Sequence, residues 1–166
     1  ARENKIPFLG VCLGFQIATI EIARHVLGLK DANSTEFDKD TQDPVICLMH
    51  EQEGVDDMGA GMRLGAENVI LDKDSKAYGL YGSERISERH RHRYEVNNGY
   101  VDQLESAGWR FVGRSENGDT MEVGQLEGHP FFMASQFHPE FKSRPMRPSP
   151  LHLGLVDAAI EYKGSE

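Results

Sequence analysis

The segment at residues 7–16, Pro-Phe-Leu-Gly-Val-Cys-Leu-Gly-Phe-Gln, constrains the fold of this chain more than any other stretch. A short apolar run ends in Gly10-Val-Cys12-Leu-Gly14, and an apolar pattern of helical period begins directly after it. This arrangement is typical of a nucleophile elbow, a tight strand-to-helix turn that presents one side chain at the edge of a sheet. We expect Gly10 and Gly14 to flank the turn because a Cβ at either position would crowd its strained backbone.

The elbow assigns Cys12 as a candidate nucleophile at a helix N-terminus, where backbone N–H groups and the helix dipole favour a thiolate. A cysteine nucleophile needs a base, and the base needs an orienting group. His138-Pro-Glu140 supplies both, because residues two apart in extended backbone share one side and Pro139 stiffens the pair. We therefore expect a triad of Cys12, His138 and Glu140. If each residue is considered alone, Cys12 is more simply a small buried residue and His138 a hydrogen-bonded loop histidine.

The elbow and His138-Pro-Glu140 together resemble the Cys-His-Glu triad of the class I (triad-type) glutamine amidotransferases. The resemblance covers residues 6–162, nearly the whole chain. One member of the family is matched more specifically, by residues 32–38, 62–65, 88–98 and 129–132. The run at 88–98, Glu-Arg-His-Arg-His-Arg-Tyr-Glu-Val-Asn-Asn, is far more specific than the elbow.

The resemblance implies a binding site for glutamine. Arg93 matches the residue of the family that binds the α-carboxylate, and a planar guanidinium fork suits bidentate carboxylate binding. Glu36 matches the glutamine-binding glutamate, an anion for the substrate ammonium. The segment after the nucleophile matches substrate-binding residues of the family, namely Leu13, Gly14, Phe15 and Gln16. The Leu13 backbone N–H would be one oxyanion donor. Without the resemblance, Glu36 is most simply a solvated loop residue or a cap.

The basic run at residues 89–93 has other interpretations when it is considered alone. It could be a nucleic-acid patch, a metal site or a solvated face. Two histidines at positions i and i+2 provide too few ligands for zinc, so we expect no metal here. The net charge of −9 disfavours nucleic acid as a partner.

The composition suggests a soluble, cytoplasmic piece. The 166 residues are enough for one domain with a real core. The hydrophobic content is 39%, no apolar run approaches membrane-spanning length, and the first residues are charged, unlike a signal peptide. We expect no membrane contact. Of the two cysteines, Cys47 is expected to be a buried thiol rather than a disulfide partner.

The order of elements predicts an α/β fold. Apolar patterns indicate strands at residues 6–11, 62–71, 109–115, 121–126 and 131–136, and helices at 13–27, 101–107 and 151–162. Residues 31–43 are expected to form a loop. Alternating strands and helices predict an open, mostly parallel sheet flanked by helices, with ligands at the carboxyl ends of the strands. The resemblance implies the flavodoxin-like form of this fold.

Residues 1–5 look like the tail of a helix that leads directly into the nucleophile strand. In the family that the chain resembles, the amidotransferase domain begins well before the elbow, and an ATP-using synthetase domain precedes it. We therefore expect residues 1–166 to be a partial amidotransferase domain. The synthetase domain, the first strands of the sheet and the glycine-rich loop that supplies a second oxyanion N–H would be absent from it, making the fold incomplete at the N-terminus.

The resemblance implies hydrolysis of L-glutamine through a thioester on Cys12. Ammonia would pass to the synthetase domain of the same polypeptide, which would use ATP and Mg to aminate UTP to CTP and would form a homo-oligomer, a tetramer. No cofactor is expected on residues 1–166.

Two alternative functions belong to other classes of protein. One is another Cys-His-Glu amidohydrolase, such as the domain of GMP synthase or a γ-glutamyl hydrolase. The other is a catalytically incompetent interaction module.

Overall fold

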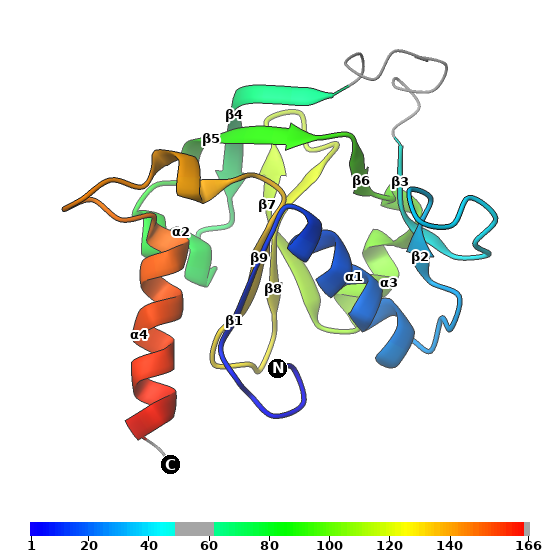
Figure 1. Cartoon of the computed structure of the whole chain (residues 1–166), viewed down its shortest axis with the longest axis horizontal. Coiled ribbons are helices and arrows are strands. Elements are labelled where there is room, and N and C mark those ends of the chain that lie inside the picture. The colour runs from blue at the N-terminus through cyan, green and yellow to red at the C-terminus, as the bar shows by residue number, and fades with distance from the viewer. Residues whose placement is uncertain (49–61, 165–166) are drawn as a thin grey trace.

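The computed structural model describes residues 1–48 and 62–164, and its central element is a six-stranded sheet (Figure 1). The strand order is β1-β9-β8-β7-β4-β5. These strands are β1 (Phe8–Val11), β4 (Arg63–Leu71), β5 (Arg85–His92), β7 (Trp109–Ser115), β8 (Met121–Leu126) and β9 (Phe132–Ser135). A smaller sheet has the order β2-β3-β6, with β2 (Asn33–Ser34), β3 (Pro44–Leu48) and β6 (Tyr94–Val96).

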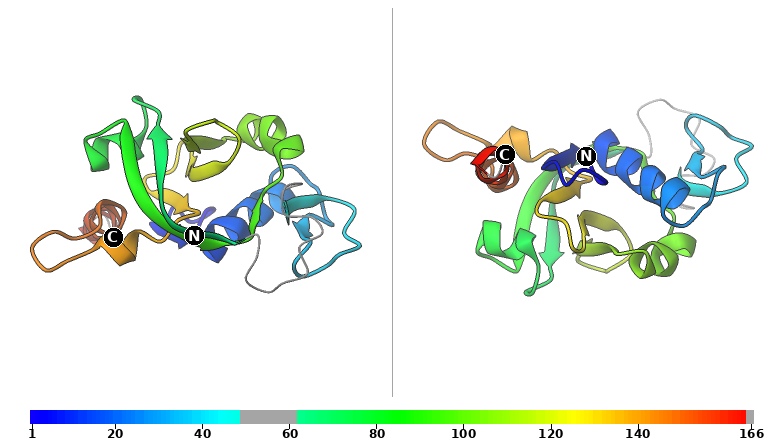
Figure 2. Two further views of the ribbon diagram at one scale, coloured as in Figure 1. Left: turned by 90° about the horizontal axis from the view of Figure 1, so that it is seen from above. Right: turned by 90° about the horizontal axis from the view of Figure 1, so that it is seen from below.

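Helices lie on both sides of the main sheet (Figures 1 and 2). On one side are α1 (Leu13–His25) and α3 (Val101–Ser106), together with the smaller sheet, and on the other are α2 (Lys76–Tyr81) and α4 (Pro150–Gly164). Two short 3₁₀ turns, η2 (Asn98–Tyr100) and η3 (Pro139–Lys142), connect other elements. A sheet covered by helices on both faces confirms the predicted α/β class.

Each face of the sheet has its own apolar core. Along β9 the side chains alternate, so that Phe132 and Ala134 join the cluster beneath α1. Phe131 and Met133 join the cluster that includes Ala77 of α2 and residues of α4. This alternation is the period-two pattern of a strand that is buried on both sides.

The expected mostly parallel pairing is wrong for the described strands of the main sheet. Only β1 and β9 pair in parallel there, whereas β9/β8, β8/β7, β7/β4 and β4/β5 are antiparallel. The reason lies in the connections, because 116–120 and 127–131 are short loops between β7, β8 and β9. A parallel pair needs a long crossover, while short loops produce antiparallel neighbours.

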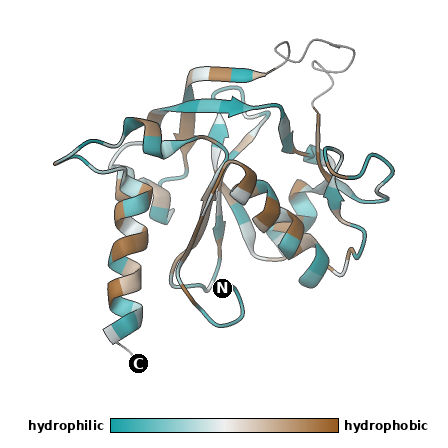
Figure 3. Cartoon of the chain, in the orientation of Figure 1, coloured by the Kyte–Doolittle hydropathy of each residue, from teal (hydrophilic) through white to brown (hydrophobic). Residues whose placement is uncertain are grey.

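Most predicted elements are confirmed with small shifts at their ends, and the strands at 109–115 and 121–126 are found with those bounds. The loop expected at 31–43 contains the two-residue strand β2. Four further elements among the described residues, β3, α2, β5 and β6, had not been predicted. Figure 3 shows why β5 was not predicted: the strand is largely hydrophilic over its length although it belongs to the sheet.

Cys47 lies on β3 and is half-buried rather than buried, and both cysteines are in the thiol form. Among the described residues, no helix combines the length and apolar character needed to cross a membrane.

The placement of β5 matters for the site. It is an edge of the main sheet, and the curled sheet brings it over the carboxyl end of β1 and the start of α1 (Figures 1 and 2). The backbone N–H of His138 donates to the Arg89 carbonyl at 2.8 Å. The chain that follows β9 therefore lies against the outer edge of β5.

Candidate active site

Cys12 forms the turn between β1 and α1. Its backbone has φ 53° and ψ −102°, a left-handed conformation that is strained for a residue with a Cβ. The turn is held by the Cys12 N–H, which donates to Ser135 O of β9 at 2.7 Å, and by the Phe15 N–H, which donates to Cys12 O at 3.0 Å. The geometry is that of the predicted elbow.

The two glycines of the elbow have different roles. A Cβ on Gly10 would lie 2.6 Å from Gly14 O and 3.1 Å from the Cβ of Ala134, so Gly10 is required by close packing. A Cβ on Gly14 would have no atom within 4 Å. The expectation that a side chain at Gly14 would crowd the turn is therefore wrong. Gly10 makes room for the Gly14 carbonyl, and the space beside Gly14 is open.

The surroundings of the thiol favour its protonated form, contrary to the expectation from the helix terminus. Burial raises the pKa of Cys12, and the carboxylates of Glu140, Glu95 and Glu36 raise it further. The Leu13 N–H at the start of α1 lowers the pKa of Cys12, as predicted, but the loss of water outweighs it. The thiol also donates to the Arg91 carbonyl of β5 at 3.9 Å, a contact that a thiolate cannot make.

The structure brings His138 and Glu140 together. His138 Nδ1 and Glu140 Oε1 are 2.7 Å apart, and the His138 ring stacks on Phe141 at 5.1 Å between centroids. The backbone that achieves this is different from the extended one we expected, because Pro139 begins the 3₁₀ turn η3. Proline is well suited to the first position of a helical turn, where its missing N–H costs nothing.

Both Cys12 and His138 contact the outer edge of β5. The Cys12 thiol contacts Arg91 O, and the His138 N–H contacts Arg89 O. Carbonyls two residues apart along a strand are about 7 Å from one another. In the described part of the chain no hydrogen bond joins the Cys12 sulfur to the His138 ring. The Cys12 thiol and the backbone of His138 are therefore neighbours along one strand.

A cavity of about 500 Å³ opens at the nucleophile. It is lined by Cys12, Leu13, Gln16, Glu36, Met62, Arg91, His92, Arg93 and Tyr94. Five residues predicted from the sequence thus meet in one place: the nucleophile, two residues of α1, Glu36 and Arg93. Gly14 is at the start of α1 but is not part of the lining. The Phe15 side chain is fully buried in the core, 6.1 Å from Phe111 between ring centroids, so it does not face this cavity.

Arg93 and Glu36 give the cavity opposite charges. Glu36 is an exposed residue at the rim. The Nε atom of Arg93 is buried and has no hydrogen-bond partner among the described residues. A buried guanidinium N–H without a partner is unusual. Because Arg93 lines the cavity, its guanidinium offers a positive charge to an anionic ligand there. A cation site and an anion site beside a thiol match the two charged groups of a free amino acid.

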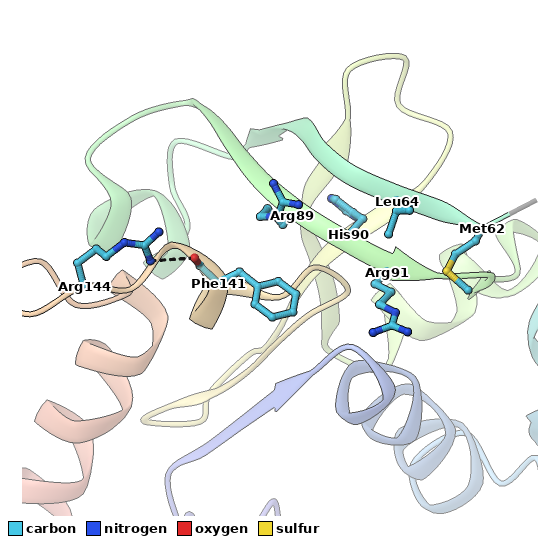
Figure 4. A pocket seen from close by; sticks show the side chains of 7 residues that line it. All are labelled: Met62, Leu64, Arg89, His90, Arg91, Phe141 and Arg144. Atoms are coloured by element: carbon cyan, nitrogen blue, oxygen red, sulfur yellow. Dashed lines mark hydrogen bonds between the residues drawn. The ribbon is translucent and has the colours of Figure 1, made fainter. Parts of the chain in front are cut away.

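A second hollow, of about 610 Å³, lies on the other side of Arg91 (Figure 4). It is lined by Met62, Leu64, Arg89, His90, Arg91, Phe141 and Arg144. Figure 4 shows Arg91 pointing from β5 toward the start of α1, and the Arg144 side chain donating to Phe141 O at 3.0 Å. Although this hollow is the larger one, it does not include the nucleophile.

The basic run is the strand β5 followed by Arg93, and its side chains alternate. Arg89 and Arg91 are exposed, whereas His90 and His92 are buried, with 2.9 Å between His90 Nδ1 and His92 Nε2. The interpretation as a wholly solvated face is therefore wrong. The alternation of histidine and arginine is itself a strand signal that could have revealed this. Within residues 1–48 and 62–164, no cluster of His, Cys, Asp and Glu is arranged to hold a metal ion.

Behind β5 lies a buried ionic cluster that the sequence analysis missed. Arg63 of β4 donates to Glu95 at 2.8 Å and to Glu122 at 2.7 Å, and it also pairs with Glu67. Burial raises the pKa of Glu95 to about 8 and lowers the pKa of His92 to about 3. The cluster joins β4, β6 and β8 immediately behind the cavity lining.

Comparisons with known proteins place the chain in a family. The family model described as "Glutamine amidotransferase class-I" matches residues 1–158, and the chain belongs to this family. Among its relatives, a CTP synthase from Archaeoglobus fulgidus is 55% identical over 166 residues. A CTP synthase from Methanosarcina mazei is 59% identical over 163 residues, 98% of this chain. The chain spans 31% and 30% of the lengths of these two relatives.

A solved structure matches as well. It is described as the glutaminase domain of Trypanosoma brucei CTPS with bound acivicin, and it superposes with a TM-score of 0.92 at 41% sequence identity. The match covers 97% of this chain and 62% of that one. Within the amidotransferase family, the chain is thus similar over its whole length to the glutamine amidotransferase part of CTP synthases.

Proposed function

We propose that this chain is the glutamine-hydrolysing part of a CTP synthase. The main support is the cavity lined by Cys12, Arg93 and Glu36, because these groups can hold an α-amino acid with its side chain at the nucleophile. The family description, "Glutamine amidotransferase class-I", supports the choice of L-glutamine as that amino acid. Ammonia released here would serve the ATP-dependent amination of UTP to CTP elsewhere in the protein.

In the proposed mechanism each group has one role. Cys12 transfers its proton to His138 and attacks the side-chain amide carbon of glutamine, while the Leu13 N–H stabilises the oxyanion. His138 then protonates the departing ammonia, leaving a γ-glutamyl thioester on Cys12. Water attacks the thioester with His138 as the base, which releases glutamate and regenerates the thiol. Glu140 holds the imidazole in register throughout.

The remaining steps belong to other parts of the protein. In this proposal a synthetase domain of the same polypeptide binds ATP and Mg, accepts the ammonia and forms the contacts of a homotetramer. The chain's coverage of about a third of its CTP synthase relatives is consistent with this division.

Replacing Cys12 by Ala in the whole protein tests the assignment. Glutamine-dependent formation of CTP should be lost, whereas formation of CTP from added ammonia should continue, because only the nucleophile is removed. Both rates are measured with UTP and ATP present. The proposal is wrong if the unmodified protein forms no CTP from either nitrogen source, as a different Cys-His-Glu amidohydrolase would, or if the folded variant still uses glutamine.

A polypeptide of residues 1–166 alone should be nearly inactive as a glutaminase. In the described sheet β1 is an edge strand paired only with β9, and an exposed edge next to the nucleophile invites aggregation. The predicted second oxyanion donor would also be absent, and one such donor is worth about 10²–10³ in kcat. Ammonia release from glutamine, measured beside the whole protein, checks this. Comparable turnover by a monodisperse monomer would refute it.

A further inference from the structure

Gln136 is a fully buried polar residue that the mechanism above does not use. It follows β9 directly, and its backbone N–H donates to Glu122 O at 2.9 Å. Its side-chain Nε2 lies 3.9 Å from the Cys12 sulfur, within hydrogen-bond distance for sulfur. The carboxamide therefore approaches the nucleophile from the protein interior rather than from the cavity.

A chain of hydrogen bonds fixes which end of this carboxamide faces the sulfur. The Tyr94 backbone carbonyl can only accept, so the atom of Gln16 that lies 2.9 Å from it must be the amide nitrogen. The same Gln16 nitrogen lies 3.3 Å from Gln136 Oε1. Turning Gln136 over would oppose two NH₂ groups across this contact. The N–H donors of Gln136 must therefore point to Cys12.

The two protonation states of Cys12 use their neighbours differently. The thiol can donate to Arg91 O, but the thiolate has no proton and gains only from donors. Burial and three nearby carboxylates already oppose the anion. A neutral amide donor at this half-buried sulfur favours the thiolate, because a hydrogen bond to a charged group is stronger than one to a neutral group.

We propose that Gln136 and Gln16 form a buried carboxamide relay that stabilises the Cys12 thiolate. Gln136 donates directly to the sulfur, and Gln16 is a positioning residue that holds Gln136 in the donating orientation. The relay begins at Tyr94, the first residue of β6 and the neighbour of Arg93, so the segment that bears the proposed carboxylate-binding arginine also orders the nucleophile. This inference deepens the proposed function, since it concerns the same cysteine.

The test measures the pKa of Cys12 directly in the whole protein. Alkylation of Cys12 by iodoacetamide is followed against pH, with the modified peptide resolved by mass spectrometry so that Cys47 does not interfere. Gln136→Met removes the donor at nearly constant volume. The pKa of Cys12 should rise by about one to two units, which is a ten- to hundredfold loss of thiolate at a fixed pH below the pKa.

Further variants separate the relay from a general loss of structure. Gln16→Met should raise the pKa of Cys12 less than Gln136→Met, and the double variant should match Gln136→Met, because Gln16 acts through Gln136. Gln136→Glu keeps the shape and should also raise this pKa, since an ionised carboxylate replaces the donor. Gln125→Met on β8, where the Gln125 side chain accepts from the Lys76 N–H at 2.9 Å, is the control and should leave the titration unchanged.

An unchanged Cys12 titration in folded Gln136→Met overturns the proposal. If that variant does not fold, an unchanged Cys12 titration in Gln136→Glu or Gln16→Met overturns the proposal instead. The alkylation requires neither glutamine nor nucleotides. The outcome is thus independent of whether the whole protein makes CTP, and the failure of one proposal is distinguishable from the failure of the other.

Discussion

Replacing Gly10 by Ala tests the close packing on which the elbow depends. The added Cβ would lie 2.6 Å from Gly14 O and 2.7 Å from Gly14 C, backbone atoms that cannot rotate away. Contacts below 3.0 Å are essentially never made by a Cβ, so the start of α1 must retreat by roughly 0.4 Å or more. The Cβ of Ala134, at 3.1 Å, blocks movement in another direction.

This displacement should affect both stability and catalysis. Forcing a methyl group into a close-packed site costs about 1–3 kcal/mol of unfolding free energy. The same shift moves Cys12 and the Leu13 N–H relative to His138, and a misplacement of about 1 Å can cost about 10² in rate. We therefore expect Gly10→Ala to lower kcat for glutamine hydrolysis by about tenfold or more, with CTP formation from ammonia preserved in the whole protein.

Gly14→Ala is the matched control because it adds the same methyl group two helical residues from the nucleophile, where no atom lies within 4 Å. It should retain or slightly raise stability, since alanine restricts the unfolded chain. Chemical denaturation and steady-state kinetics on both variants provide the comparison. Equal stability and equal kcat for Gly10→Ala and the unmodified protein would refute the packing argument.

Two further predictions concern the groups behind and within the cavity. Arg93→Lys should raise KM for glutamine strongly, because a point charge replaces a bidentate fork, and an effect on kcat alone would remove Arg93 from carboxylate binding. The pKa of Glu95 is raised from 4.5 to about 8 in the folded protein. Protonated Glu95 therefore contributes to the folding stability below pH 4.5, and this contribution is progressively lost as the pH rises toward 8. Glu95→Gln should remove this loss of stability between about pH 5 and 8 in urea titrations of the amidotransferase domain, and an unaltered pH dependence of stability would contradict the assignment.

The local parts of the site could be predicted from the sequence because each depends on a short pattern. The strand-to-helix turn at Cys12 follows from two glycines and an apolar run, and the contact between His138 and Glu140 follows from their spacing. The backbone between His138 and Glu140 nevertheless differs from the expected extended segment, because Pro139 begins a helical turn. The direction of the Cys12 pKa shift also could not be read locally, since it is determined by burial and by carboxylates distant in sequence.

The long-range parts of the site could not be derived in this way. Only the family resemblance assigned Arg93 and Glu36 to one site with Cys12, because nothing in their immediate sequence distinguishes them from surface residues. The pairing of Arg63 with Glu95 and Glu122 joins three strands, and no short pattern reports such a contact. The mostly parallel sheet was a general expectation for alternating elements, and the short loops before β8 and β9 override it.

The edge strand β5 explains how residues 126 positions apart come to act together. Its outward carbonyls at Arg89 and Arg91 would be unpaired at a sheet edge, and they are covered by the His138 N–H and the Cys12 thiol. Its inward histidines pack against the Arg63 cluster, which anchors the strand from behind. The strand β5 therefore holds the backbone of His138 and the thiol of Cys12 two residues apart along one edge. Arginines alternate with histidines there because one face of β5 is exposed while the other packs against the interior of the protein.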